Sequence, residues 1–318
     1  MVYILQILFV LALMLVGYLV RKRGMISAVG TSEMARVLMA VIYPCLIFSS
    51  VTRLNARELA AHWMMPVMAL TISGTGLILG LLALRCMKEV DQRRASAFLF
   101  QNTVNNYLFL PLPLVMLLWG SQGVALLVFA SMGFELTVWT VGVFLFNRSN
   151  RLVEGIRMMF GPPLIVLLFS IGWVCVRDLL QPSLPSDGFL SSLAQRVLAL
   201  IYFGAETVGK ATVAVSMLVA GSRIAALNVH AVFDKQVWLV VLLRLIVTPI
   251  IFILILKQVP LDSTAYGILA VVAVMPAAIA SLVFSERFGG DSDFLATTLL
   301  VTHLGAIVTI PLLLAWAL

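Results

Sequence analysis

Residues 101–113 have the sequence QNTVNNYLFLPLP, in which three asparagines precede two prolines inside an otherwise apolar run. Residues 275–281, MPAAIAS, place another proline inside an apolar run near the other end of the chain. A proline inside a helix removes one backbone hydrogen bond, and its ring clashes with the carbonyl group four residues earlier. The two stretches therefore predict two interrupted helices. Each interruption lies inside an apolar run, and this combination decides the fold.

The chain around these stretches is too apolar for a soluble protein. Of its 318 residues, 62% are hydrophobic and 11% are charged, whereas about 25% are charged in an ordinary soluble domain. This small number of polar side chains cannot cover the surface of a protein in water. Much of the surface must therefore face lipid. The net charge of +7 comes mainly from Lys and Arg in short loops, without interleaved aromatic residues. We therefore expect membrane lipids as partners, and no nucleic acid.

Ten apolar runs approach the length that a helix needs to cross the hydrocarbon core. They cover residues 3–20, 34–51, 64–84, 95–119, 123–146, 163–176, 193–221, 236–256, 265–288 and 294–318. Most Lys and Arg residues fall in loops that lie in the cytosol if the N-terminus is outside, as the positive-inside rule requires. The sequence therefore predicts a multi-pass membrane protein with both termini outside.

The segment 146–161 separates the first five runs from the last five. Because five is odd, the second half must enter the membrane upside down relative to the first. The two proline-containing stretches then occupy the equivalent fourth and ninth helices. Inverted repeats with discontinuous helices are typical of secondary transporters whose sites lie near the midplane. We predict an all-α integral membrane protein of ten helices in two inverted repeats, residues 1–150 and 151–318, with broken, crossing fourth and ninth helices.

Three asparagines near the first interruption are candidate binding residues. Asn102, Asn105 and Asn106 are spaced three and four apart, so they would share one helix face. An amide side chain can bind a carboxylate, an ion or a backbone group that the interruption leaves free. Hydrogen bonding between helices is the structural alternative. For Asn106 we favour contact with substrate or freed backbone, and for Asn102 both uses stay open.

Arg244 and Glu135 lie deep in predicted spans. A charge at mid-bilayer costs about 2.5–3.5 kcal/mol on insertion scales, so each should face a cavity or a partner. Either the two residues pair, or Arg244 binds an anion and Glu135 responds to protons. Glu206 and Lys210, four residues apart, are expected to pair along one helix. His303 is expected to act mainly as an ordinary hydrogen-bonding residue.

Four motifs together resemble the auxin efflux carrier family, which is similar in fold to the bile acid–sodium symporters. They are residues 106–113 (NYLFLPLP), 244–249 (RLIVTP), 275–289 (MPAAIASLVFSERFG) and 297–314 (TTLLVTHLGAIVTIPLLL). The resemblance covers essentially the whole chain, and the short central segment resembles compact bacterial members. It therefore implies a bacterial inner membrane, a scaffold domain and a transport domain, and elevator-like movement of an organic anion. It also suggests a homodimer.

By match to these motifs, Asn106, Pro113 and Pro276 occupy the family's functional positions. Leu108 and Pro111 replace two motif glycines. Taking the residues and the resemblance together, the candidate substrate contacts are Asn102, Asn105, Asn106, Tyr107, Pro111, Pro113, Glu135, Arg244, Pro276, Ala277, Ala278, Ser281 and His303.

The favoured function is transport of small organic anions such as carboxylates by alternating access. The alternative, prompted by the motif departures, is a non-transporting membrane receptor or scaffold that binds an organic acid or a partner protein. No catalytic motif is present, so an enzyme is not expected. Neither a cofactor nor a metal ligand set is expected, because the three cysteines are dispersed. Coupling to Na⁺ or H⁺ stays open.

Overall fold

The computed structural model describes residues 2–87, 89–146, 160–180, 189–226, 233–282, 284 and 290–318. Within these ranges the chain is helical, with short turns and a single isolated β-bridge. Among the described residues, seven segments are long and apolar enough to cross a membrane. The prediction of an all-helical membrane protein is confirmed. The count of ten helices and their inverted arrangement stay predictions, and most of the central segment 146–161 lies outside the described residues.

The described elements follow in chain order. They are α1 (Val2–Lys22), α2 (Ala28–Val37), η1 (Leu38–Ile42), α3 (Tyr43–Val51), α4 (Ala56–Ala61), α5 (Met64–Arg85), α6 (Gln92–Thr103), α7 (Pro111–Thr137), η2 (Val138–Gly142), α8 (Val143–Phe146), α10 (Pro162–Leu180), α11 (Phe189–Gly209), α12 (Ala211–Ala225), α13 (Lys235–Leu242), η4 (Leu243–Val247), α14 (Thr248–Leu256), α15 (Ser263–Ala273) and α17 (Ser292–Ala317).

Two π-helical segments lie directly before prolines. The segment η1 precedes Pro44, and η4 precedes Pro249. Because proline has no N–H, it cannot complete the regular helical bond to the carbonyl four residues back. The wider π turn lets the N–H of Tyr43 reach Leu38 O, and that of Thr248 reach Leu243 O. The helices therefore continue past these prolines, whereas the two predicted interruptions are real breaks.

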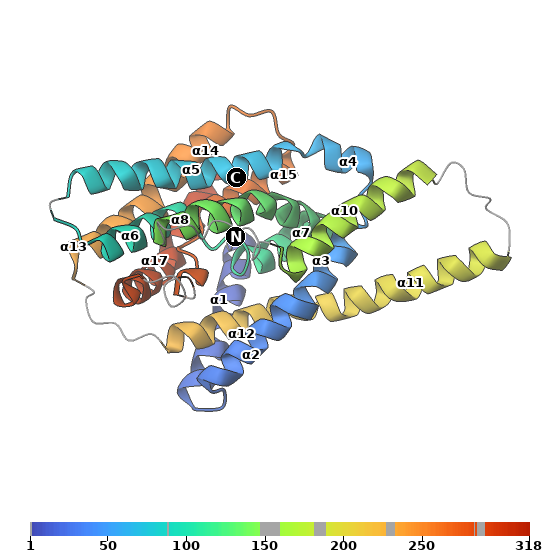
Figure 1. Ribbon diagram of the computed structural model, residues 1–318, viewed down its shortest axis with the longest axis horizontal. Helices are drawn as coiled ribbons and strands as arrows, with labels where there is room; N and C mark the ends of the chain where they lie inside the picture. Colours follow the sequence, from blue (N-terminus) through green and yellow to red (C-terminus); the bar gives the residue numbers. More distant parts are fainter. Residues whose placement is uncertain are drawn as a thin grey trace.

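The helices form two layers. Layer A contains α1, α2, α3, α10, α11 and α12, in which α1 packs against α12, and α3 packs against α10 and α11. Layer B contains α5, α6, α7, α13, α14, α15 and α17, in which α5 packs against α6 and α7, and α13 packs against α17. Figure 1 shows α2, α3, α11 and α12 along one side of the molecule, and α5, α6, α13 and α14 along the other. The layers meet chiefly where α3 contacts α7.

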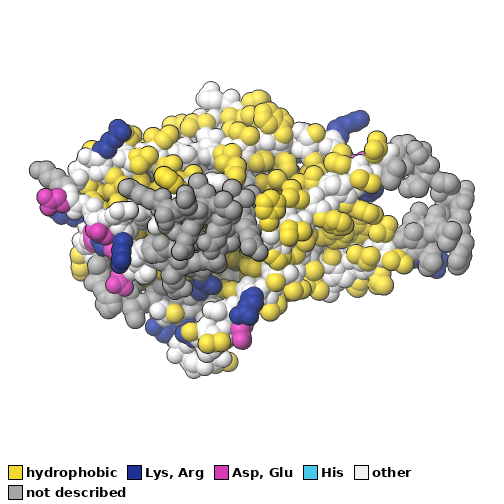
Figure 2. Space-filling model, viewed as in Figure 1, with side chains coloured by type: hydrophobic (Ala, Val, Ile, Leu, Met, Phe, Trp, Pro, Cys, Tyr) yellow, Lys and Arg dark blue, Asp and Glu magenta, His cyan; other side chains and the backbone are white. Residues whose placement is uncertain are grey.

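Charged residues gather toward two ends of the molecule. At one end, which we call the Arg94 end, Arg94 pairs with Asp234 and with Asp291, whose Oδ2 lies 2.8 Å from Nη1. At the other, the Arg53 end, Arg177 donates to the carbonyls of Thr52 and Leu54 at 2.6 and 2.7 Å. Figure 2 shows hydrophobic side chains over much of the described surface of the face in view, with most of the charged side chains toward its margins. This distribution suits a protein whose middle lies in lipid.

Candidate functional site

The two predicted interruptions contact each other through their backbones. The first covers residues 104–110, between α6 and α7, and the second begins at Val274, after α15. The N–H of Asn106 donates to Pro276 O at 2.8 Å, and the N–H of Ala278 donates to Val104 O at 3.3 Å. Asn105 and Ala277 form an antiparallel bridge between these bonds. Backbone groups that each helix loses are therefore satisfied by the other segment, as the interior of a membrane protein requires.

The prolines have different roles in the two interruptions. Pro111 and Pro113 lie in the first turn of α7, where a missing N–H costs little because that group has no helical partner. Pro276 lies inside the second interruption, and its carbonyl accepts the bond from Asn106. The first interruption thus lies just before the proline pair rather than around it. Residues 283 and 285–289 of the second motif lie outside the described residues.

The side chain of Asn106 accepts hydrogen bonds from the backbone just before and at the start of α7. Its Oδ1 accepts from the N–H groups of Phe109 and Leu110 at 3.1 and 3.4 Å. This is one of the two uses expected for Asn106, and contact with a substrate stays a prediction. Asn105 Nδ2 donates to Val272 O at 2.6 Å, so the first interruption is also tied to the end of α15. Both asparagines are buried.

Arg244 binds the ends of both interrupted helices. Its Nη1 donates to Asn102 O at 3.2 Å, and its Nη2 donates to Ala273 O at 3.1 Å. In a continuous helix, Asn102 O would accept from the N–H of Asn106, which instead donates to Pro276. A cation at two helix C-termini also compensates their partial negative charge. The side chain of Arg244 has no exposed surface, so it lies behind the crossing rather than in a cavity.

Glu135 has partners other than Arg244. Its two carboxylate oxygens accept from the hydroxyl of Tyr107 and from Nε1 of Trp139, both at 2.8 Å. The ring of Tyr107 also stacks on Phe134, with centroids 4.9 Å apart. Of the two interpretations offered by the sequence, the structure therefore does not support the Glu135–Arg244 pair. Glu135 instead holds the first interruption through Tyr107.

Several buried polar atoms around the crossing have no protein partner among the described residues. They include Gln101 Oε1, Asn102 Oδ1, Thr103 Oγ1, Asn105 Oδ1, Ser281 Oγ and His303 Nε2. Other atoms of the same side chains are satisfied: Asn102 Nδ2 donates to Phe98 O at 2.9 Å, and His303 Nδ1 lies 2.8 Å from Leu299 O. Buried polar groups of this kind are usually paired with protein or ordered water. The crossing is therefore a polar centre in an apolar molecule.

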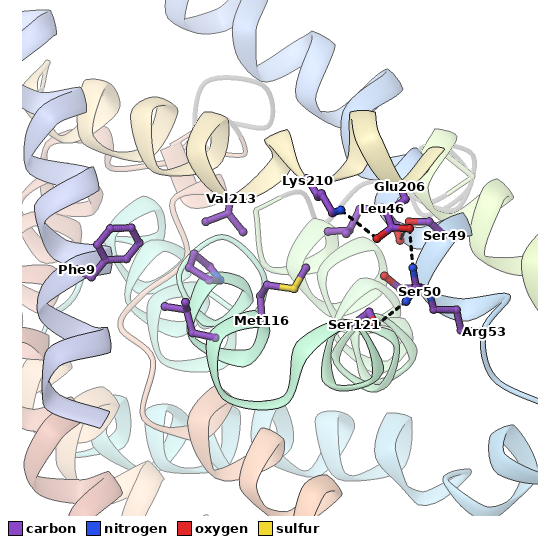
Figure 3. Close-up of a pocket in the computed structure, with 12 residues that line it drawn as sticks. Phe9, Leu46, Ser49, Ser50, Arg53, Met116, Ser121, Glu206, Lys210 and Val213 are labelled. Atoms are coloured by element: carbon purple, nitrogen blue, oxygen red, sulfur yellow. Dashed lines mark hydrogen bonds and ion pairs between the residues drawn. The ribbon is translucent and has the colours of Figure 1, made fainter. Parts of the chain in front are cut away.

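Two cavities lie between the layers. The first, with a volume of about 460 Å³, we call the Arg53 cavity. Layer A contributes Phe9, Leu46, Ser49, Ser50, Arg53, Glu206, Lys210 and Val213, and layer B contributes Pro113, Met116, Leu117 and Ser121 (Figure 3). The second, of about 230 Å³, we call the Trp139 cavity, and it is lined by Ala35, Met39, Phe109, Trp139, Val219, Ala220, Arg223, Ile279, Ala280 and Phe284.

The cavities lie on the two sides of the crossing. Along α12 and the turn before it, Lys210 and Val213 face the Arg53 cavity, whereas Val219 and Arg223 face the Trp139 cavity. Ala220, which also lines the Trp139 cavity, packs against Ala277 and Ile279 of the second interruption. Layer A therefore contacts the crossing, and both layers line each of the two cavities.

Comparison with known proteins identifies the family. A family model described as a membrane transport protein matches residues 2–156 and 151–314. The chain belongs to this family, the auxin efflux carriers. The chain is also similar to an uncharacterized transporter of Methanothermobacter thermautotrophicus, with 25% identity over 313 residues, which cover 96% of this chain and 95% of that protein. The resemblance seen in the four motifs is confirmed, and the protein is a membrane transporter by family.

In this auxin efflux carrier, Pro113 is the predicted contact that lines the Arg53 cavity. Sequence reasoning missed Phe109, Trp139 and Arg53 as cavity residues. The expected pairing of Glu206 with Lys210 is confirmed, with Nζ and Oε1 3.1 Å apart. Only that spacing pointed toward the Arg53 cavity, because Arg53 is remote in sequence from both.

Proposed function

We propose that this protein is a secondary transporter or facilitator that moves small organic anions, chiefly carboxylates, across the cytoplasmic membrane by alternating access. The observation that carries this proposal is the backbone crossing of two interrupted segments between two cavities. In transporters, discontinuous helices of this kind place binding groups in the middle of the membrane. Membership of the transporter family supports the same conclusion.

The two layers suggest how access would alternate. Layer B contains both interruptions, and each cavity has one wall from layer A and one from layer B. Movement of layer B against layer A would enlarge one cavity as it closes the other. The proposal includes two inverted repeats, residues 1–150 and 151–318, in which layer B would be the transport domain and layer A the scaffold.

The choice of an anion rests on charge. The Arg53 cavity has two cationic residues, Arg53 and Lys210, against one acidic residue, Glu206, among its lining residues. The first turn of α7, which contains Pro113, adds the partial positive charge of a helix N-terminus. No step of the proposal requires a cofactor. Imposed Na⁺ and H⁺ gradients in the assay described next would show whether either ion is coupled.

The test is flux into proteoliposomes of labelled malonate, succinate and benzoate. The wild-type protein should take up at least one of them, and protein-free liposomes set the background. Asn106→Ala should slow uptake, because Phe109 and Leu110 lose the acceptor that organises the start of α7. Asn106→Asp keeps an acceptor but adds negative charge. Recovery in Asn106→Asp would limit Asn106 to a backbone role, whereas continued loss would place Asn106 next to the anion.

The same experiment separates transport from the receptor alternative. A receptor would bind one of these acids in detergent without moving it into liposomes. Binding with no flux under every imposed gradient would therefore overturn the transport proposal in favour of a receptor. Equal flux in wild type and Asn106→Ala would instead show that the crossing is not the transport site.

A further inference from the structure

Three charged side chains form a chain of contacts at the wall of the Arg53 cavity. Arg53 Nη2 lies 2.7 Å from Glu206 Oε2, and Lys210 Nζ lies 3.1 Å from Glu206 Oε1. Each oxygen of one carboxylate is therefore taken by a different cation. Figure 3 shows Arg53 and Lys210 approaching Glu206 from two sides, beside the cavity. The arrangement is that of a carboxylate-binding site whose occupant is part of the protein.

The surroundings favour an exchangeable occupant. Glu206 is 37% exposed and its two partners are more exposed still, and ion pairs at such exposure contribute little to stability. Removal of the Glu206 carboxylate would leave two cations beside a cavity that Ser49 and Ser50 also line. Two cations with a single acid leave an excess positive charge, which attracts anions into a cleft.

The position links this site to the crossing. The same cavity is lined by Pro113 and Met116 from the start of α7, so an anion held at Arg53 would have apolar surface beside it. Arg53 also donates from Nη1 to Ser121 Oγ at 3.3 Å. Ser121 follows Gly120, at the kink in α7, so Arg53 connects layer A to layer B.

We propose that the carboxylate of an organic acid binds between Arg53 and Lys210 by displacing the carboxylate of Glu206. Glu206 is then a built-in competitor that keeps the site occupied when no substrate is present. The anion class rests on the proposed function. In the exchange, the carboxylate of the ligand takes over the contacts with both cations, and the displaced carboxylate of Glu206 stays attached to α11 beside the site. The site is the entry point from the Arg53 end, before the crossing.

If Glu206 competes with the ligand, replacement of Glu206 should increase the affinity for a carboxylate. Glu206→Gln leaves both cations in place and removes the competing charge, so binding of a carboxylate should tighten by about tenfold. Arg53→Gln and Lys210→Gln should each weaken it by about tenfold. A Glu206 that merely supported the structure would give the opposite result for its own replacement, because the loss of two ion pairs would loosen the site.

The experiment measures binding of sodium malonate, succinate and benzoate to purified protein in detergent by titration calorimetry, with ionic strength held constant with sodium chloride. Succinamide, which has no charge, is the matched ligand control and should not bind. Lys257→Gln is the matched protein control, because Lys257 lies over the ring of Trp316 and lines neither cavity. Each variant's melting temperature without ligand reports folding, and Lys210→Gln, at 69% exposure, is the variant least able to disturb it.

Three results would overturn the proposal: equal or weaker binding by Glu206→Gln, wild-type affinity in both Arg53→Gln and Lys210→Gln, or no binding of any of the three acids. Flux in proteoliposomes is a separate readout. If the wild-type protein transports an acid but Glu206→Gln binds it no better, this inference fails and the proposed function stands. If the binding order is as expected without flux, the transport proposal fails and the site stands.

Discussion

Arg244 holds the crossing together through two carbonyl groups. Replacement by Met would leave Asn102 O and Ala273 O buried without these donors, at a cost of about 1–3 kcal/mol for each. We expect Arg244→Met to lower the free energy of unfolding by several kcal/mol, as measured by denaturant unfolding in detergent. Arg36→Met, at an exposed position in α2, is the control and should change it by less than about 0.5 kcal/mol. Equal stability of both variants would contradict the role given to Arg244.

Asp262 makes the stability of the Arg53 end depend on pH. Burial alone would raise the pKa of the Asp262 carboxyl, but hydrogen bonds from the backbone of Ala265 and Thr264 and the proximity of His62 hold the pKa below its ordinary value. Because the pKa is lower in the folded state, the stabilisation is full above the unfolded pKa of about 3.9 and is lost as pH falls through the folded value.

We therefore expect the melting temperature of the wild type to fall more steeply than that of Asp262→Asn below about pH 5. Asn is the appropriate replacement, since it serves as well as Asp at a helix N-cap, which is the position of Asp262 before α15. Parallel pH curves for the two proteins would show that Asp262 does not contribute.

The residues at the crossing were only partly predictable. Three asparagines and the prolines marked it, because helix breakers and buried amides are rare inside apolar runs. The partners of Arg244 were not, since they are main-chain carbonyls that any sequence carries. The polar contacts of Glu135 depend on Trp139, which is four residues away, and on Tyr107, which only the fold brings near.

At the scale of helices, α5 and α6 approach closely because of Gly76. A Cβ atom added at Gly76 would overlap the backbone oxygen of Asn102, whereas one added at Gly74 would meet nothing within 4 Å. Gly76→Ala should therefore push the end of α6 away from the crossing and destabilise the protein by about 1–3 kcal/mol. Gly74→Ala, on the same helix, should stabilise it by about 0.5–1 kcal/mol.

Melting of both variants in detergent, with uptake in proteoliposomes, measures this difference. Destabilisation by Gly74→Ala as large as that by Gly76→Ala would mean that the approach of α6 is not the cause. We also expect uptake to fall in Gly76→Ala alone, because only that variant displaces Asn102 and its bond to Arg244.

The sequence predicted the presence of the helices better than the positions at which they turn or end. The predicted boundary between the fourth and fifth apolar runs coincides with Gly120, whose φ of +60° and ψ of −151° are not helical, so α7 consists of two helices that meet at this kink. Glycine adopts that conformation at little cost, so no polar loop marked the turn. The seventh run divides at Lys210 into α11 and α12. There Gly209 packs against the backbone of Leu46, a contact between distant residues that no local pattern reveals.

At the scale of the whole molecule, the loop charges predict that the Arg53 end faces outward and the Arg94 end faces the cytosol. Cys86 is exposed after α5, toward the Arg94 end, and Arg57 is exposed in α4, at the opposite end of α5. In proteins with one cysteine each, a membrane-impermeant maleimide added to intact cells should label Arg57→Cys and not Cys86. Cys86 should react only after the cells are broken. The reverse pattern would invert the orientation and place the Arg53 cavity on the cytosolic side.

The crossing is made of main-chain N–H and C=O groups from Val104, Asn106, Pro276 and Ala278. Every amino acid supplies these groups, except that proline lacks the N–H. Side chains around the joint, such as Leu108 and Ala280, can therefore change over evolutionary time while the joint itself persists. Carriers of this family can therefore change their substrate while the backbone crossing stays the same. A mutant library aimed at new cargo should vary these neighbours freely and exclude proline only at Asn106 and Ala278.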